Sequence, residues 1–252
     1  MIFTLGRFKA RLAASDDDVI ACQQLRYLAF IEARGVGGAP DPDADRRDED
    51  EFDADCSHLM VEDTRSGQLV CCFRMMPLEN GLEIGRTYSA KYYGLDALRD
   101  YPGKMVEMGR FCVHPAWQDP AILRVAWSAM TKFVDDTGVE LMFGCSSFQG
   151  IDAEKYMDAF ALLKERHLAP SRWLPRVKAP RVFQFGRLLG LRRPDMKLAL
   201  KGMPPLLRTY LVMGGWVSDH AVIDNDLNTL HVFTGIETAR VPQSRKRLLR
   251  RD

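Results

Sequence analysis

The stretch from Met105 to Pro115, MVEMGRFCVHP, places two charges inside a segment that otherwise has the composition of a buried strand. Glu107 and Arg110 occupy positions from which an ordinary core strand excludes charged side chains. A carboxylate in apolar surroundings has its pKa raised toward the range that suits a general base. Glu107 is therefore a candidate catalytic residue, and a structural ion pair at a strand end is the alternative.

Length and composition predict one domain with an ample core, since the chain has 252 residues of which 46% are hydrophobic. Six cysteines form no C-x-x-C pair, which predicts free thiols in a reducing cytosol. The amino-terminal segment is too short and too basic for a signal peptide, and no apolar run approaches about 20 residues. We expect a cytoplasmic protein, either soluble or peripheral at the inner face of the cytoplasmic membrane.

The net charge of +1 conceals two strongly charged regions. Nine acidic residues face two arginines between Asp41 and Asp55, whereas eleven basic residues face two acids between Phe160 and Lys201. The carboxyl end, SRKRLLRRD, is again basic. Such segregation predicts one cationic and one anionic partner, although solvated faces and a disordered tail would also explain it.

Hydrophobic periodicity and end signals predict an α+β domain over residues 1–237, followed by a basic, disordered tail over 238–252. A helix is expected to follow the cap at Ser15 and to end near Glu32. Further helices are predicted over 121–136, 153–166 and 204–213, and strands over 8–13, 58–62, 69–75, 105–113, 141–145, 216–223 and 230–235. The Gly-, Pro- and Asp-rich residues 35–55 are expected to form a loop, and the Pro- and Arg-rich residues 168–202 a basic, irregular insertion.

The order of charged and aromatic residues resembles that of a known enzyme class. Arg26 and Phe30 lie four apart in LRYLAF, Asp50 and Asp53 bracket an aromatic residue in DEFD, and Arg74 interrupts LVCCFRMM. Followed by the glutamate and arginine of the 105–113 strand, this series resembles the autoinducer-synthase-like branch of the GNAT acyltransferases. The segments CSHLMVED, EMGRFCVHP, LMFGCSSFQGID and PPLLRTYLVMGGWVSDHAVIDNDLNTLHVF are similar to those of the L-ornithine N-alpha-acyltransferases, and the resemblance runs from Phe8 to Thr234.

The resemblance implies a GNAT fold, in which helices flank a mixed, mostly antiparallel sheet. In this fold a bulged strand holds the acyl donor, and here that strand would be formed by Arg110, Phe111, Cys112 and Val113. Its backbone N–H groups would stabilise the oxyanion, and Glu107 would deprotonate the attacking amine, directly or through water. The resemblance further implies catalytic roles for Glu107 and Arg110, and donor contacts by Phe111, Cys112, Val113 and Arg74.

The segment after this strand, HPAWQDPAILRV, differs from a CoA-binding loop. It has no glycine, two prolines that donate no N–H group, and Asp119, which would repel a pyrophosphate. This departure favours an acyl carrier protein as partner and co-substrate, which would dock on basic side chains of the insertion. The same side chains could instead contact membrane headgroups. These basic residues are Arg172, Arg176, Lys178, Arg181, Arg187, Arg192 and Arg193.

The reaction implied is transfer of a (3-hydroxy)acyl chain from acyl carrier protein to the α-amine of L-ornithine, which would give lyso-ornithine lipid. Asp50 and Asp53 could bind the side-chain ammonium group, although capping of the loop would also explain the two aspartates. Arg74, or Arg26 with Phe30 near it, could bind the α-carboxylate by bidentate pairing. No cofactor is expected, and the five scattered histidines predict no metal site.

Two other functions stay open from the sequence. An autoinducer synthase acting on S-adenosylmethionine would share the same charged residues, and a non-catalytic protein that binds membrane or carrier protein could keep the fold. Nucleic-acid binding is disfavoured because the basic segments match no recognised module. A serine hydrolase is disfavoured because Ser146 and Ser147 lack the G-x-S-x-G turn.

Overall fold

The computed structural model describes residues 2–35 and 45–244. The chain divides into two compact units, of which unit 1 comprises Met1–Pro77, Met108–Val139 and Gln243–Asp252, and unit 2 comprises Leu78–Glu107 and Glu140–Pro242. The single domain over 1–237 stays a prediction, and most of the expected tail, 245–252, lies outside the described residues.

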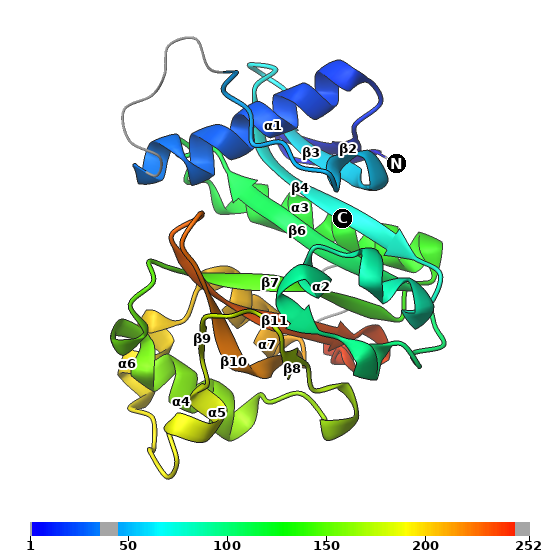
Figure 1. Cartoon of the computed structure of the whole chain (residues 1–252). Coiled ribbons are helices and arrows are strands. Elements are labelled where there is room, and N and C mark those ends of the chain that lie inside the picture. The colour runs from blue at the N-terminus through cyan, green and yellow to red at the C-terminus, as the bar shows by residue number, and fades with distance from the viewer. Residues whose placement is uncertain (1, 36–44, 245–252) are drawn as a thin grey trace. The chain divides into compact units, whose positions relative to one another are not determined.

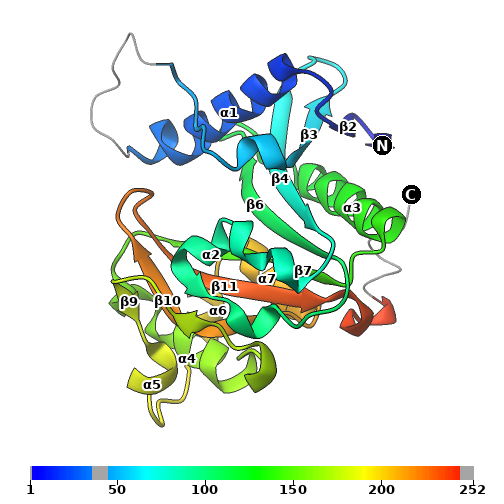
Figure 2. The same cartoon turned by 45° about the vertical axis from the view of Figure 1, so that its right-hand side comes forward.

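Unit 1 contains antiparallel strands with a helix on each face (Figures 1 and 2). Strand β1 pairs with β2, β2 with β3, and β3 with β4, all antiparallel. The strands are β1 (Ile2–Leu5), β2 (Phe8–Leu12), β3 (Ser57–Asp63), β4 (Leu69–Leu78) and residues 108–113 of β6 (Met105–Val113), and the helices are α1 (Asp16–Phe30) and α3 (Pro120–Thr137). The prediction missed β1, a strand of four residues that alternate between exposed and half-buried.

The two helices of unit 1 begin at the residues that the sequence marks. The Ser15 side chain accepts a hydrogen bond from the amide of Asp18, and three aspartates in the first turn of α1 complement the positive end of the helix. Asp119 caps α3, Pro120 occupies its first turn, and Gly138 ends it in the left-handed conformation that glycine adopts readily. Both helices are therefore specified locally.

The face of unit 1 beneath α1 has a small, sulfur-rich core. Cys22 and Leu25 of α1 pack on Met60, Cys72 and Cys112 from the strands. The Sγ atoms of Cys72 and Cys112 lie 3.5 Å apart, and both residues are buried, free cysteines. The expectation of free thiols is confirmed, since all six cysteines are free.

Unit 2 has an antiparallel sheet in the order β7-β11-β10-β9, and a separate pair, β5 with β8 (Figures 1 and 2). The strands are β5 (Tyr93–Gly94), β7 (Leu141–Gln149), β8 (Arg176–Val177), β9 (Val182–Phe183), β10 (Trp216–Asp224) and β11 (Thr229–Glu237). The helices are α2 (Ser89–Tyr92), α4 (Met157–Arg166), α5 (Phe185–Leu188), α6 (Met196–Gly202) and α7 (Pro205–Val212). Three-residue or longer 3-10 turns connect them, including Gly81–Arg86 and Asp96–Leu98.

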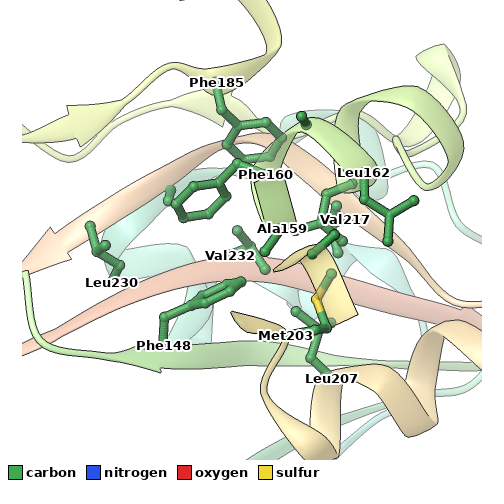
Figure 3. Packing of buried hydrophobic residues seen from close by; sticks show 14 of the residues in the cluster. Phe148, Ala159, Phe160, Leu162, Phe185, Met203, Leu207, Val217, Leu230 and Val232 are labelled. Carbon is green, nitrogen blue, oxygen red and sulfur yellow. The ribbon is translucent and has the colours of Figure 1, made fainter. Parts of the chain in front are cut away.

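One face of this sheet carries the main core of unit 2. Phe148, Leu230 and Val232 of the strands meet Phe160 of α4 and Phe185 of α5, and the last two rings stack at 5.1 Å (Figure 3). Burying five such side chains contributes about 1.5–3 kcal/mol each relative to exposure. This core therefore accounts for much of the stability of unit 2.

The prediction that residues 168–202 form an irregular excursion is wrong. The segment contains β8, β9, α5 and α6, and its side chains Phe185, Leu189 and Ala199 are buried in the core of unit 2. These elements have two to seven residues, too few to show a helical or strand period, and prolines and arginines separate them. The periodicity that identified the longer elements was thus not available here.

The predicted class is confirmed, since helices flank mostly antiparallel strands in an α+β arrangement. The expected helices over 121–136, 153–166 and 204–213, and the strand over 105–113, agree with α3, α4, α7 and β6 within a few residues. In the described part of the chain, no helix has both the length and the apolar composition that crossing a membrane requires.

Candidate functional site

The carboxylate of Glu107 is buried in unit 2 and held by two backbone amides. Its side chain lies on β6 and is 5% exposed. Oε1 accepts a hydrogen bond from the amide of Ser89 at 2.6 Å, and Oε2 accepts one from the amide of Tyr88 at 2.9 Å. These amides begin the short helix α2, where backbone N–H groups have no partner within the helix. They fix the carboxylate in one orientation and favour its ionised form.

Glu107 is therefore suited to receive a proton from an amine, either directly or through a water molecule. The expectation that its environment raises its pKa toward neutrality stays a prediction, because apolar burial and amide donors act in opposite directions. No sequence signal marked the two amides. The segment that supplies them, between β4 and β6, contains only turns and short helices without periodicity.

Arg110 interrupts the extended backbone of β6 three residues later. Its φ of 53° is left-handed, which is uncommon for a residue with a side chain, and it falls where the donor-binding bulge was predicted. Its Nη2 donates to Oδ2 of Asp50 at 3.0 Å, and its Nε lies 3.0 Å from Oδ2 of Asp48. Among the described residues, Arg110 thus has acidic partners other than Glu107.

The other predicted donor-binding residues of β6 lie beyond this interruption. The ring of Phe111 stacks on Phe73 of β4 with centroids 5.2 Å apart, and Cys112 belongs to the core beneath α1. Val113 is half-buried at the end of the strand. The backbone turn at Arg110 and the aromatic stack together shape this part of the strand.

Four of the predicted residues of unit 1 form one buried ion-pair network. The guanidinium of Arg26 donates to both carboxylate oxygens of Asp53, at 2.8 and 2.7 Å. Arg74 donates to Oδ1 of Asp53 at 2.8 Å and to Oδ2 of Asp50 at 2.9 Å. Arg26 and Arg74 are 1% and 3% exposed, so both charges depend on these partners.

Burial and pairing oppose one another at Asp53. Burial alone would raise the pKa of its carboxyl, but hydrogen bonds from Arg26, Gln23 and Arg74 outweigh burial, and the pKa is lowered. The pKa of Asp50 is lowered in the same way, against burial, by Arg74 and Arg110. Both carboxylates are therefore ionised at neutral pH.

The structure thus brings together Arg26, Asp50, Asp53, Arg74 and Arg110 in unit 1. Phe30 is not in this network: it packs on the core beneath α1, and the guanidinium of Arg34 lies 5.2 Å from the centre of its ring. The prediction missed two members, Gln23, which donates to Asp53 at 3.0 Å, and Asp48. Asp48 belonged to the acidic run but had no separate signal.

In the described ranges, no three His, Cys, Asp or Glu side chains are placed to bind a metal ion. The expectation that the protein needs no cofactor stays a prediction.

Comparisons with known proteins agree with this arrangement. The model of the acetyltransferase (GNAT) domain family matches residues 25–128. The L-ornithine N(alpha)-acyltransferase of Rhodobacter capsulatus is 32% identical over 95% of this chain and 93% of its own length, and that of Brucella abortus is 30% identical over 94% and 86%. A solved N-acyl amino acid synthase from uncultured soil microbes is 10% identical, covers 92% of each chain and has a TM-score of 0.48.

The expected enzyme class, a GNAT acyltransferase, is confirmed by the domain match, which includes Arg26 and the end of α1, the acidic segment, Arg74 and the whole of β6. The match at 32% identity extends over nearly all of both chains, so similarity is not confined to this shared domain. The chain therefore belongs to the L-ornithine N(alpha)-acyltransferase family.

Proposed function

We propose that this protein transfers a (3-hydroxy)acyl chain from an acyl carrier protein to the α-amine of L-ornithine, giving lyso-ornithine lipid. The relatives named as L-ornithine N(alpha)-acyltransferases support the acceptor. The observation that carries the proposal for this chain is the buried Glu107 carboxylate, which two amides hold on the strand predicted to bind the donor.

In the proposed reaction, the nitrogen of the amine attacks the thioester carbonyl carbon while Glu107 receives a proton from the nitrogen. Backbone N–H groups of β6 after Arg110 would stabilise the oxyanion, an effect typically worth about 3 kcal/mol for one donor. The C–N bond forms, the C–S bond breaks, and the carrier's thiolate leaves and is protonated to the thiol. The product is an amide, and no oxidant or reductant is needed.

The start of α3 supports a carrier protein over CoA as donor. The Oδ1 atom of Asp119 accepts the hydrogen bond of the Ala121 amide at 2.8 Å, and Pro120 has no N–H group to offer. A carboxylate of the protein thus already occupies the place where a pyrophosphate would bind at a helix start. A carrier-bound pantetheine has a single phosphodiester and does not require that place.

Basic side chains near α2 provide a docking surface for the acidic carrier. Strand β8, which contains Arg176, pairs with β5, and β5 directly follows α2. Arg176 is exposed, and the next basic residue, Lys178, donates to the carbonyl oxygen of Ala90 in α2 at 2.5 Å. A carrier held by this strand would deliver its thioester close to the helix whose amides hold Glu107.

The ion-pair network has a different proposed role. Acceptor binding by Asp50, Asp53, Arg26 and Phe30 stays a prediction, but the aspartates and arginines already satisfy one another. This mutual pairing supports a structural role, in which α1 and β4 hold the acidic segment 45–55 in place. Binding of an acceptor ammonium by Asp53 would require Arg26 and Arg74 to give up a buried partner, which is costly.

Membrane association is proposed through the turn between α5 and α6, which projects from unit 2 in both views (Figures 1 and 2). Leu188 and Leu191 are 58% and 100% exposed, and Arg187, Arg192 and Arg193 beside them are also exposed. Exposed leucines flanked by arginines suit the interface of an anionic bilayer, into which an amphiphilic product must be released.

Replacing Glu107 by glutamine should reduce kcat for acyl transfer at least about 100-fold, because loss of a general base typically costs that much or more. Steady-state assays with acyl carrier protein and ornithine measure the effect, and thermal unfolding checks the fold. The exposed Glu154→Gln exchange in unit 2 is the matched control. Activity of E107Q within about threefold of the unaltered enzyme would show that Glu107 is not the base.

Replacing Asp53 by asparagine should lower the free energy of unfolding at pH 7 by about 3 kcal/mol, because the buried guanidinium groups of Arg26 and Arg74 lose a negatively charged partner. The pKa of Asp53 is lowered on folding, so its stabilisation is complete above about pH 4 and is lost as the pH falls further. Urea unfolding from pH 7 down to pH 2 should show a loss that is constant to about pH 4 and shrinks steadily below it. The exposed Asp136→Asn exchange should cost less than about 0.5 kcal/mol, and an equally small cost for D53N would refute the structural role.

Acyl carrier protein thioesters should give a higher kcat/KM than matching CoA thioesters, and the advantage should shrink as salt screens the basic surface. The Arg176→Ser variant should lose activity with the carrier while its activity with CoA thioester stays unchanged. Both donors are assayed in parallel at low and high salt. A further assay replaces ornithine by S-adenosylmethionine, the rival acceptor. Equal use of both donors at low salt would contradict the carrier proposal.

Vesicles containing phosphatidylglycerol should co-sediment the protein weakly and in a salt-sensitive manner, both at full length and when it is truncated after Glu237. Serine at Leu188 and Leu191 together should reduce sedimentation severalfold, since each buried CH₂ group contributes about 0.8 kcal/mol. Leu82→Ser, at a leucine 71% exposed elsewhere in unit 2, is the control. Absence of sedimentation at low salt would contradict membrane binding, and the carrier protein would then be the only proposed partner of the basic residues.

A further inference from the structure

The two faces of the sheet in unit 2 differ in character. In the antiparallel pair of β7 and β11, His231 lies opposite Ser147 and Phe233 lies opposite Cys145. Residues opposite one another point to the same face. This face is therefore separate from the one that carries Phe148 and the main core, and it is partly open, since Ser147 is exposed and Cys145 half-buried.

His231 is a buried histidine on this face whose protonation state follows from its partner. The Oη atom of Tyr93 lies 2.7 Å from the carbonyl oxygen of His231 and 3.1 Å from its Nδ1. Tyrosine has one hydroxyl proton, and a carbonyl oxygen can only accept, so Tyr93 donates to the carbonyl. Nδ1 must then carry the proton and donate to Oη, which leaves Nε2 of His231 with a lone pair.

This lone pair has no hydrogen-bond donor among the described residues, although His231 is only 2% exposed. Burial, and then the neighbouring His220, lower the pKa of His231 to about 4. The imidazole is neutral at physiological pH, so Nε2 is an acceptor and not a donor. A buried acceptor left without a donor destabilises a protein, so a group that donates a hydrogen bond to Nε2 would stabilise this site.

The position of His231 connects it to the proposed reaction centre within unit 2. Helix α2 begins at Ser89, whose amide holds Glu107, and ends at Tyr92, whose half-buried ring meets His231 edge-on at 5.1 Å. The Oγ atom of Ser89 lies 3.6 Å from Sγ of Cys145. Ser147, the residue opposite His231, is two positions beyond Cys145 on β7, which is a separation of about 7 Å along the strand. A substituent a few bonds from the reacting carbonyl could span this separation.

We propose that Nε2 of His231 accepts a hydrogen bond from a hydroxyl group carried by the acyl chain near its thioester, so that His231 selects hydroxylated donors. The inference rests on the proposed function, because it requires an acyl donor at Glu107. A hydroxyl donates to a neutral imidazole, whereas an unsubstituted chain would leave Nε2 without a donor. Sites built to bind a hydroxyl discriminate strongly against analogues that lack it.

The test uses two substitutions that each keep one half of the imidazole's hydrogen bonding. The amide of asparagine reaches the position of Nδ1, and that of glutamine reaches the position of Nε2. We measure the ratio of kcat/KM for 3-hydroxyacyl and unsubstituted acyl chains of equal length on the carrier protein. His231→Asn should reduce this ratio at least tenfold, and His231→Gln should retain most of it.

His220 supplies the matched control. It is also fully buried, lies on the adjacent strand β10, and likewise has an Nε2 without a partner among the described residues, but its Nδ1 faces the Asp219 carboxylate at 2.7 Å. Because the ring of His220 lies 5.2 Å from that of Tyr93, His220→Asn should change the ratio, but less than His231→Asn does. If His231→Asn fails to fold, Tyr93→Phe replaces it: the hydroxyl that fixes the tautomer is removed, the ring remains, and the ratio should fall partially.

A ratio unchanged in His231→Asn, or an unaltered enzyme without preference for the hydroxyl, would overturn the inference. An equal fall for both chains with a raised KM for ornithine would also overturn it, because the hydrogen-bond donor would then belong to the acceptor. If the unaltered enzyme acylates ornithine with neither chain, the proposed function fails instead. The ratio of dissociation constants for the two carrier thioesters, from calorimetry, then tests His231 by itself.

Discussion

Compensation of buried charge is the constraint on which the chemistry of this protein depends. A guanidinium that is 1% exposed, as in Arg26, is tolerated only with a partner of opposite charge and satisfied donors. Asp53 meets this requirement for Arg26 and Arg74 together, and Asp50 extends the pairing to Arg110. Charge pairing thereby fixes the acidic segment to one helix and two strands, in addition to the buried ring of Phe52.

Glu107 is held by donors of another kind, the backbone amides of Tyr88 and Ser89. The aspartates of unit 1 face fixed cations, which hold them ionised and leave little tendency to take up a proton. The two amides orient the buried carboxylate of Glu107. Such a carboxylate can accept a proton from an amine and later release it.

The same constraint holds for a neutral buried group, His231, on the partly open face of the sheet in unit 2. Tyr93 fixes the tautomer of His231, and the lone pair that results faces no described donor, so selectivity for a hydroxyl follows from one proton on one nitrogen. We propose separate partners for the basic residues of unit 2. Arg176 lies on the strand paired with β5, whereas the arginines beside Leu191 lie in the turn between α5 and α6.

The sequence by itself determined the long elements, because caps, periodicity and glycine stops act locally: Ser15 and Gly138 mark helix ends in the chain as in the structure. It also identified Glu107 and the Arg and Asp residues, since charge within apolar runs is visible without coordinates. Only the tertiary structure showed that Asp53 binds two arginines, that amides of Tyr88 and Ser89 hold Glu107, and that Tyr93 sets the tautomer of His231. Those contacts join residues between 18 and 138 positions apart, and pairing at such separation leaves no periodic trace in the chain.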